Sequence, residues 1–443
     1  MAKPVTKYSV RVENPFEIKR ELEKAFQIAT SNNPGPVLID LPADVQRADI
    51  DIASCPTYEI NNKSFAQNEK IIEDINEMIR KSARPCFLVG HGVKLSGAVE
   101  QMKSLIYKLN IPTVFSMPAF DTMTYADELN FGFIGTNGKR YANFVVGKSD
   151  LVISIGSRLD IKQVGNERSK FARQAQIIRI DIDQGNLSYK IHEDEVQYCT
   201  DIKSLLEKWD ESYNPRVSSE WIDVCKQIKH ELEGFDDDPY TTLLYEIFEM
   251  LPPNVIITTD VGQSDVWLAQ QLRVKEKQSV HMSAGHGAMG FSLPAAIGAY
   301  YGSRRPVYSF SGDGGIQMNI QELQFIVREK LPIAIFVINN YSLGMIRQFQ
   351  EANFNSNFSQ TTEKTGYTVP SFEKIASAYG IEYVRIETPN DIVRHKEPVT
   401  RPTLFEIVIQ EKTILKPNFG KNGVIQDQIP YLDRQKYQEL MEL

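Results

Sequence analysis

Short apolar runs alternate with amphipathic segments along two long stretches of the chain. Residues 65–210 contain the runs PCFLVGHG, PTVFSM, DLVISIGS and QIIRIDID, and residues 219–410 contain NVIITTD, PVYSFSGDGG, PIAIFVINN and PTLFEIVI. Segments with helical spacing, such as NEKIIEDINEMIRK and GAVEQMKSLIYKLN, lie between the runs of the first stretch. This alternation predicts βαβ units and parallel sheets covered on both faces. The sequence therefore predicts an α/β protein with two doubly wound parallel-sheet domains, a central Rossmann-like domain over 65–210 and a second over 219–410.

The two ends of the chain have different patterns. Residues 15–30 have helical spacing, and NNPGPVLIDLP then predicts a turn and one short strand. One helix and one strand cannot enclose a core, so residues 1–50 are expected to be the C-terminal remnant of a third domain. Residues 411–443 have no strong pattern and are expected to form a tail.

Composition narrows the class of protein. The chain has 443 residues and a net charge of -8, with no stripe of lysine and arginine, which argues against a nucleic-acid partner. No apolar run reaches the ~20 residues needed to cross a bilayer, and the first residues lack the apolar core of a signal peptide. The four cysteines are far apart, which argues against a zinc site or a disulfide framework. We therefore expect a cytoplasmic protein that does not bind membranes.

Two polar side chains follow predicted strands of the second domain. Asp313 follows the run PVYSFSG, and Asn340 ends the run PIAIFVINN. Ligands of open parallel sheets bind beyond the carboxyl ends of the strands. Glycines 312, 314 and 315 let a bulky anion approach the backbone, and a helix expected to start near Gln317 would point its positive end at the same place. A carboxylate and an amide oxygen suit a hard divalent cation, so the stretch predicts a magnesium–diphosphate site.

The spacing of these two motifs is typical of thiamine-diphosphate enzymes, and longer stretches extend the likeness. DVGQSDVWLAQ, SAGHGAMGFSLPAAIGA, GDGGIQMNIQEL and NNYSLGMIRQFQE resemble the diphosphate-binding domain of the acetolactate synthase family. NGKRYANFVVGKSDLVISIGSRLD resembles that family's central domain, and ATSNNPGPVLIDLPADVQ resembles the end of its pyrimidine-binding domain. The resemblance covers the chain except its last ~30 residues and implies thiamine diphosphate and Mg²⁺ as cofactors.

The resemblance also implies roles for individual residues. Asp313, Asn340 and the carbonyl of Ser342 would hold the metal. Met289 would support the V-shaped conformation of the cofactor, although it could also be ordinary core. The other residues implied in binding the cofactor are Gly262, Gln263, Gly287, Gly312, Gly314, Gly315, Gly344 and Met345. Ser264 stands where the family usually has histidine, so one phosphate contact is replaced or lost.

Many members of this family bind FAD in the central domain, and the resemblance implies contacts at five positions here. They are Gly92, Arg158, Asp181, Ile182 and Asp183. Two motifs differ from the family pattern. The family's RFDDR reads RLDIK, which places Lys162 where an arginine meets the substrate carboxylate, and its LGMHG reads IGTNG. Lysine pairs with a carboxylate as a point charge rather than as a fork.

The implied reaction is decarboxylation of a 2-keto acid such as pyruvate, with carboligation of the product to an acceptor. Two alternatives stay open, a 2-keto acid decarboxylase or oxidase of the same superfamily, and a catalytically silent cofactor-binding fragment. The family's activating glutamate lies in its first domain, and no residue of this sequence matches it. We therefore expect an N-terminally truncated chain with no activating residue of its own. The family's active site forms between two subunits, which implies a homodimer or homotetramer.

Overall fold

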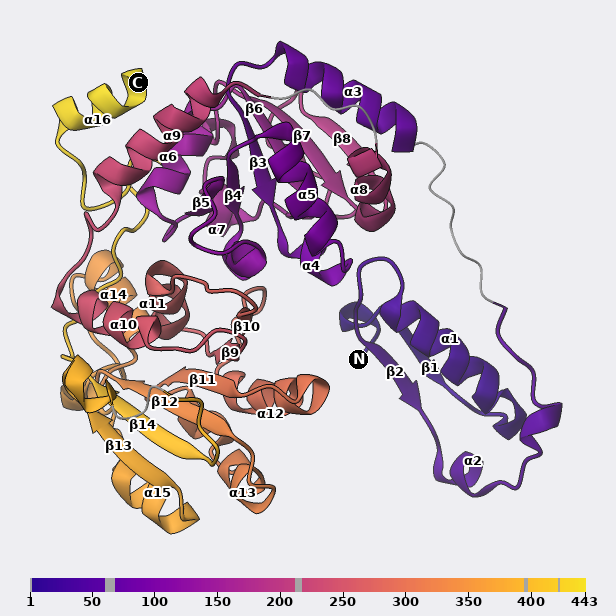
Figure 1. Ribbon diagram of the computed structural model, residues 1–443. Coiled ribbons are helices and arrows are strands. Elements are labelled where there is room, and N and C mark those ends of the chain that lie inside the picture. Colours follow the sequence, from indigo (N-terminus) through magenta and orange to yellow (C-terminus); the bar gives the residue numbers. More distant parts are fainter. Residues whose placement is uncertain (1, 60–67, 212–216, 394–396, 421–422) are drawn as a thin grey trace.

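The computed structural model describes residues 2–59, 68–211, 217–393, 397–420 and 423–443. Three sheets follow one another along the chain (Figure 1). The first has two parallel strands, β1 (Tyr8–Arg11) and β2 (Val37–Asp40), connected through α1 (Ile18–Thr30) and followed by α2 (Ala43–Arg47). Apolar side chains of α1 are left in solvent, with Phe26 73% exposed. The sequence predicted only β2, so β1 is a second strand that it missed. None of residues 2–59 belongs to the two clusters of buried hydrophobic residues.

The central sheet has the strand order β5-β4-β3-β6-β7-β8 with every pair parallel. Its strands β3 and β6 are buried at every residue because helices cover both faces. These helices pack in two groups: α8 contacts both α3 and α5, and α6 contacts α9 (Figure 1). The elements are α3 (Asn68–Lys81), β3 (Pro85–Val89), α4 (His91–Leu95), α5 (Val99–Leu109), β4 (Thr113–Phe115), β5 (Asn130–Phe133), α6 (Arg140–Lys148), β6 (Leu151–Ile155), α7 (Ile161–Val164), β7 (Gln176–Asp181), β8 (Val196–Cys199), α8 (Ile202–Glu211) and α9 (Ser219–Leu232).

The C-terminal sheet has the order β10-β9-β11-β12-β14-β13 and is also parallel throughout. Phe310, Phe336 and Phe405 are paired across three adjacent strands, and their rings stack with centroids 4.6 and 4.5 Å apart. The elements are α10 (Pro239–Glu249), β9 (Ile256–Thr259), α11 (Gln263–Gln271), β10 (Ser279–Met282), α12 (Ser292–Ser303), β11 (Val307–Gly312), α13 (Glu322–Arg328), β12 (Ile333–Asn339), α14 (Gly344–Asn353), α15 (Phe372–Tyr379), β13 (Glu382–Ile386) and β14 (Thr403–Val408).

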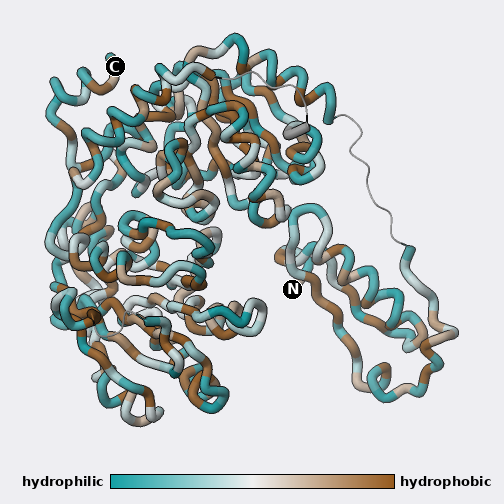
Figure 2. The backbone as a smooth tube through the Cα atoms, in the orientation of Figure 1, coloured by the Kyte–Doolittle hydropathy of each residue, from teal (hydrophilic) through white to brown (hydrophobic). Residues whose placement is uncertain are grey.

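Hydrophobic residues follow the strands of both large sheets, while hydrophobic and hydrophilic residues alternate along the outer helices (Figure 2). This distribution agrees with the predicted α/β class, and the parallel sheets fit doubly wound domains. Among the described residues, no helix is both long and apolar enough to cross a membrane.

The C-terminal tail leaves the C-terminal sheet and returns to the central one, where α16 (Arg434–Glu442) lies near α6 and α9 (Figure 1). The buried amide of Gln428 donates to the carbonyls of Thr136 and Gly138 at 3.0 and 3.1 Å. The guanidinium of Arg140 donates to the Gln428 carbonyl at 3.1 Å. The tail therefore links the two large sheets.

In the described part of the chain, no α-helix starts near Gln317, where the sequence predicted one. Residues Ile316–Asn319 form a single 3-10 turn, and α13 begins only at Glu322. The prediction of a helix that points its positive end at the glycine turn was therefore wrong. The side-chain amide of Gln317 instead donates to the carbonyl of Asp313 at 2.8 Å, which closes the turn locally.

Candidate cofactor site and adjoining cavity

The candidate site lies at the carboxyl edge of the C-terminal sheet. From β9 the chain goes first to β10 on one side and then to β11 on the other, so β9 and β11 flank a topological switch point. Most of the predicted cofactor residues are in the three segments that follow β9, β11 and β12, and Gly287 and Met289 are in the loop before α12. The fold thus brings together the segments that the sequence singled out.

Asp313 and Asn340 end neighbouring strands, with Gly312 paired to Ile338. Tyr341 has a φ of 54°, which turns the chain back so that the Ser342 N–H donates to Asp313 Oδ2 at 3.3 Å. The Asn340 amide nitrogen donates to Gln263 Oε1 at 2.9 Å and to Thr413 Oγ1 at 3.2 Å. No described residue donates to Asn340 Oδ1, so this oxygen is available to a ligand.

Asp313 is 2% exposed, and its carboxylate has no cationic partner among the described residues. Tyr367 donates to its Oδ1 at 2.8 Å. Burial raises the pKa of Asp313 to about 6, despite this hydrogen bond and those from backbone N–H groups. A buried carboxylate, a free amide oxygen and a backbone carbonyl form an all-oxygen donor set, which fits a hard divalent cation. Among the described residues there is no cluster of three or more His, Cys, Asp or Glu that could hold a metal.

The glycines of the site have different roles. Gly312 has nothing within 4 Å of the position of a Cβ, so the turn leaves open space there. A Cβ on Gly315 would lie 2.3 Å from Asp260 Oδ2, and one on Gly344 would lie 1.9 Å from Gln263 Oε1. Gly315 and Gly344 are therefore needed for packing within the protein, whether or not their N–H groups also bind a phosphate.

Gln263 is buried and its side chain is engaged by protein groups. Its Nε2 donates to the Thr413 carbonyl at 3.2 Å and to Gln348 at 3.3 Å, and its Oε1 accepts from Asn340. The structure therefore supports a role in orienting Asn340. Its predicted contact with the diphosphate stays a prediction, as do those of the other cofactor residues.

Met289 belongs to a loop that is held by one buried carboxylate. Asp260 accepts from the N–H groups of Gly290 and Phe291 at 2.9 and 3.2 Å, and from Val261 at 3.1 Å. Met289 is 41% exposed, and its Cε lies 3.4 Å from the Cβ position of Gly314. The alternative that Met289 is ordinary core is therefore wrong, because the side chain lies over the glycine turn and in solvent.

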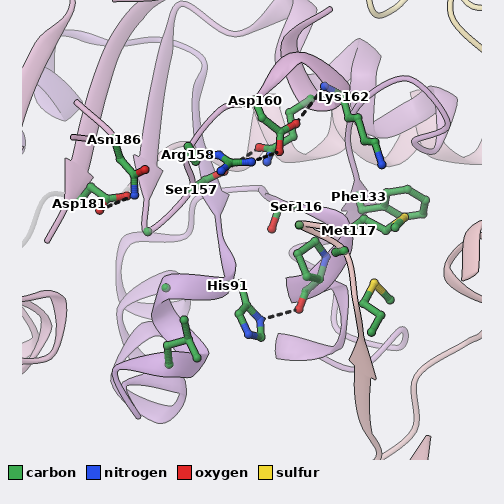
Figure 3. Close-up of a pocket in the computed structure, with 18 of the residues that line it drawn as sticks. His91, Ser116, Met117, Phe133, Ser157, Arg158, Asp160, Lys162, Asp181 and Asn186 are labelled. Carbon is green, nitrogen blue, oxygen red and sulfur yellow. Dashed lines mark hydrogen bonds and ion pairs between the residues drawn. The ribbon is translucent and has the colours of Figure 1, made fainter. Parts of the chain in front are cut away.

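A cavity of about 930 Å³ opens between the central and C-terminal sheets (Figure 3). Four of the five residues predicted to contact FAD line this cavity, namely Gly92, Arg158, Asp181 and Ile182. The fifth, Asp183, does not line it. Arg158 pairs with Asp160 at 3.3 Å, and Asp181 accepts from Asn186 at 3.3 Å. Burial raises the pKa of Asp181. Beyond the carboxyl ends of the central strands there is thus room for a large ligand with polar groups.

The other end of this cavity approaches the cofactor site, where Val261, Met345 and the loop residues 284 and 285 line it. Lys162 and Asp265 also line the cavity. Asp265 is 6% exposed, and its Oδ1 has no hydrogen-bond partner. Burial raises the pKa of Asp265 to about 7, and the positive charge of Lys162 opposes that shift.

Sequence reasoning missed four residues of the site, namely Asp260, Asp265, Tyr367 and Thr413. The sequence did contain a signal for Asp260, because this aspartate ends the predicted strand NVIITTD just as Asp313 follows the predicted strand PVYSFSG. Thr413 had none, because it lies in the tail and meets Gln263 across 150 positions of sequence.

Comparisons with known proteins agree with this geometry. The central-domain model of thiamine pyrophosphate enzymes matches residues 72–209, and the C-terminal TPP-binding domain model matches 260–407. The chain is 32% identical over 428 residues to an acetolactate synthase large subunit of Lactococcus lactis, covering 94% of this chain and 73% of the relative. It is 33% identical over 384 residues to the isozyme 2 large subunit of Escherichia coli, covering 85% and 68%. A chloroplastic acetolactate synthase of Zea mays is 29% identical over 453 residues, covering 97% and 70%. The chain therefore belongs to the acetolactate synthase large-subunit family of thiamine-diphosphate enzymes.

Proposed function

We propose that this enzyme decarboxylates a 2-keto acid, with pyruvate as the donor, and joins the remaining acyl unit to the carbonyl of an acceptor. The observation that carries the proposal is the large cavity. Val261 and Met345, from the segments that follow β9 and β12, line one end of it, and Arg158 and Asp181 line the end beyond the central strands. Thiamine diphosphate supplies, when bound, the nucleophilic carbon and the electron sink for decarboxylation. The residues of this chain hold, orient and shield it.

In this proposal Asp313, Asn340 and the Ser342 carbonyl hold Mg²⁺, which anchors the diphosphate. The Ser342 carbonyl already accepts from Gly344 N–H at 2.8 Å and keeps a second lone pair for the metal. Met289 supports the bent cofactor, since it overlies the same turn. Exposed apolar side chains nearby, including Ile346 and Phe349, support a homodimer or homotetramer in which another copy completes the site.

Lys162 and Asp265 are proposed to face the reactants. The ammonium of Lys162 makes no hydrogen bond within the described part of the chain and can pair with the carboxylate of the 2-keto acid. Asp265 Oδ1 is buried without a partner and can hold a proton beside the acceptor. A protonated carboxyl donates to a carbonyl or hydroxyl oxygen, which favours an uncharged polar acceptor over a second carboxylate.

Product analysis tests the reaction. The chain, alone and together with a polypeptide that supplies the family's activating glutamate, is incubated with pyruvate, thiamine diphosphate and Mg²⁺, with and without an added ketone acceptor. Carbon dioxide and coupled products are measured. We expect release of carbon dioxide that rises with acceptor concentration and an equal amount of coupled product. Release with free acetaldehyde as the only organic product would instead make the enzyme a simple decarboxylase. Failure to consume pyruvate even when the activating glutamate is supplied would contradict the proposal.

We also propose that the large cavity binds FAD, because Gly92, Arg158, Asp181 and Ile182 line one wall of a space of suitable size. Titration with FAD, followed by quenching of flavin fluorescence, measures the affinity. Replacing Arg158 by Gln removes a charged donor and should weaken binding roughly 10-fold. Arg168→Gln is a matched control, because Arg168 stacks on Tyr189 at 4.2 Å and does not line the cavity. Equal affinity in both variants would remove Arg158 from the site.

A further inference from the structure

A second cavity, of about 410 Å³, lies between the central sheet and the segment that follows α11. Its walls come from β5, the end of α9 and residues 269–274, and the Tyr125 N–H joins the two sides by donating to the Val274 carbonyl at 2.9 Å. Phe133 lines both cavities, but none of the predicted cofactor residues lines this one. The cavity is therefore separate from the proposed catalytic site.

Three cationic side chains line this cavity. The guanidinium of Arg273 lies between the rings of Tyr125 and Tyr245, 4.6 and 4.8 Å from their centroids. The ammonium of Lys229 lies 4.6 Å from the Tyr125 centroid and donates to a backbone carbonyl at 3.1 Å. Lys139 makes no side-chain hydrogen bond or ion pair with any described residue. Aromatic faces thus hold two cations in place beside a third that lacks a partner.

The acidic groups around the cavity do not balance these charges. Glu233 pairs with Arg273 at 3.6 Å, and Asp237 accepts from Gln271 at 3.4 Å. Asp236 is committed to Arg140, at 2.6 and 2.7 Å. Three cations against two carboxylates leave one positive charge. Burial lowers the pKa of Lys139 to about 8, although the charge of Asp237 acts against this shift. Burial and the charge of Arg273 lower the pKa of Lys229 to about 8.

The hydroxyl of a largely buried tyrosine lies beside the unpaired lysine. Tyr141 is 3% exposed, lines the cavity and makes no hydrogen bond through its hydroxyl to any residue that the structure describes. A Cβ on Gly132 would lie 3.2 Å from both Lys139 Cγ and Tyr141 Cε2, so these side chains lie together against the glycine. Because Tyr141 lines the cavity, its hydroxyl can donate to a ligand oxygen that enters there.

We propose that this cavity binds a small organic monocarboxylate. Its carboxylate lies among Lys139, Lys229 and Arg273 and accepts from the Tyr141 hydroxyl, while its apolar part contacts the surrounding rings. One negative charge matches the single uncompensated positive charge, whereas a phosphate dianion would exceed it. The bound anion would bridge the central sheet and the segment after α11.

Calorimetric titration of the full chain with benzoate tests the proposal, with benzamide as the neutral ligand of the same shape. We expect benzoate to bind saturably and benzamide to bind at least 10-fold more weakly. Lys139→Met should weaken benzoate binding roughly 10-fold or more. Lys208→Met is the matched control, because Lys208 is a lysine of α8 that pairs with Glu69 outside the cavity, and it should leave binding unchanged.

Tyr141→Phe is a second variant that removes only the hydroxyl and should weaken benzoate binding roughly 3- to 10-fold. Because Lys139 and Tyr141 do not line the large cavity, these losses also exclude binding of benzoate there. Any of three results would overturn the proposal. Benzoate and benzamide could bind equally well, benzoate could fail to saturate at concentrations on the order of 10 mM, or both cavity variants could keep the native affinity. Tighter binding of inorganic phosphate than of benzoate would overturn the assignment to a monocarboxylate.

Discussion

Replacing Asp313 by Ala should weaken magnesium-dependent binding of thiamine diphosphate roughly 100-fold or more. The variant removes the one carboxylate of the proposed metal site, and the amide and carbonyl oxygens that remain carry no charge to offset that of the cation. Calorimetric titration with thiamine diphosphate, at fixed Mg²⁺ and in excess chelator, measures the effect. The native chain should bind only with the metal present.

Asp313→Asn separates charge from shape in this experiment, since it keeps the size of the side chain and should still lose the magnesium dependence. Glu406→Gln provides the matched control. Glu406 is a buried carboxylate of the same sheet that accepts from Asn339 at 2.6 Å, and it lies on β14 outside the glycine turn. If binding by the Asp313 variants keeps its dependence on Mg²⁺, this residue is not a metal ligand.

Replacing Asp260 by Ala should lower the thermal midpoint of unfolding by roughly 6 °C or more and abolish cofactor binding. The substitution takes the acceptor from three backbone N–H groups, and each buried donor left without a partner costs about 1–3 kcal/mol. Two of those donors, Gly290 and Phe291, fix the loop that carries Met289. Scanning calorimetry with and without the cofactor measures both effects.

Asp391→Ala is the control for this substitution. Asp391 also accepts two backbone N–H bonds, at 3.0 and 2.8 Å, but it is exposed, so water can replace it. Its loss should change the midpoint by little. An Asp260 variant with native stability and native cofactor affinity would show that the loop is held by other contacts.

The interior strands of both sheets were predictable from the sequence, and the edge strands were not. The predicted runs are β3, β4, β6 and β7 in the central sheet and β9, β11, β12 and β14 in the C-terminal sheet. Neighbours on both sides and helices on both faces bury such strands, so their sequences are mostly apolar. The edges β5, β8, β10 and β13 escaped prediction. Of these, β8, β10 and β13 are partly exposed, so polar residues interrupt their apolar pattern.

By itself, the sequence determined the α/β class and the place of the glycine turn at a strand end. Strand patterns placed Asp313 and Asn340 at strand ends, and parallel strands end at one edge of a sheet. Only the tertiary structure decided which groups complete the site. Thr413 reaches Gln263 from the tail, and Tyr367 reaches Asp313. Lys162 and Asp265, from the two large domains, line one cavity, close enough for the charge of Lys162 to act on Asp265. Such contacts join residues far apart in the chain, and because the fold alone creates them, no local period or spacing encodes them.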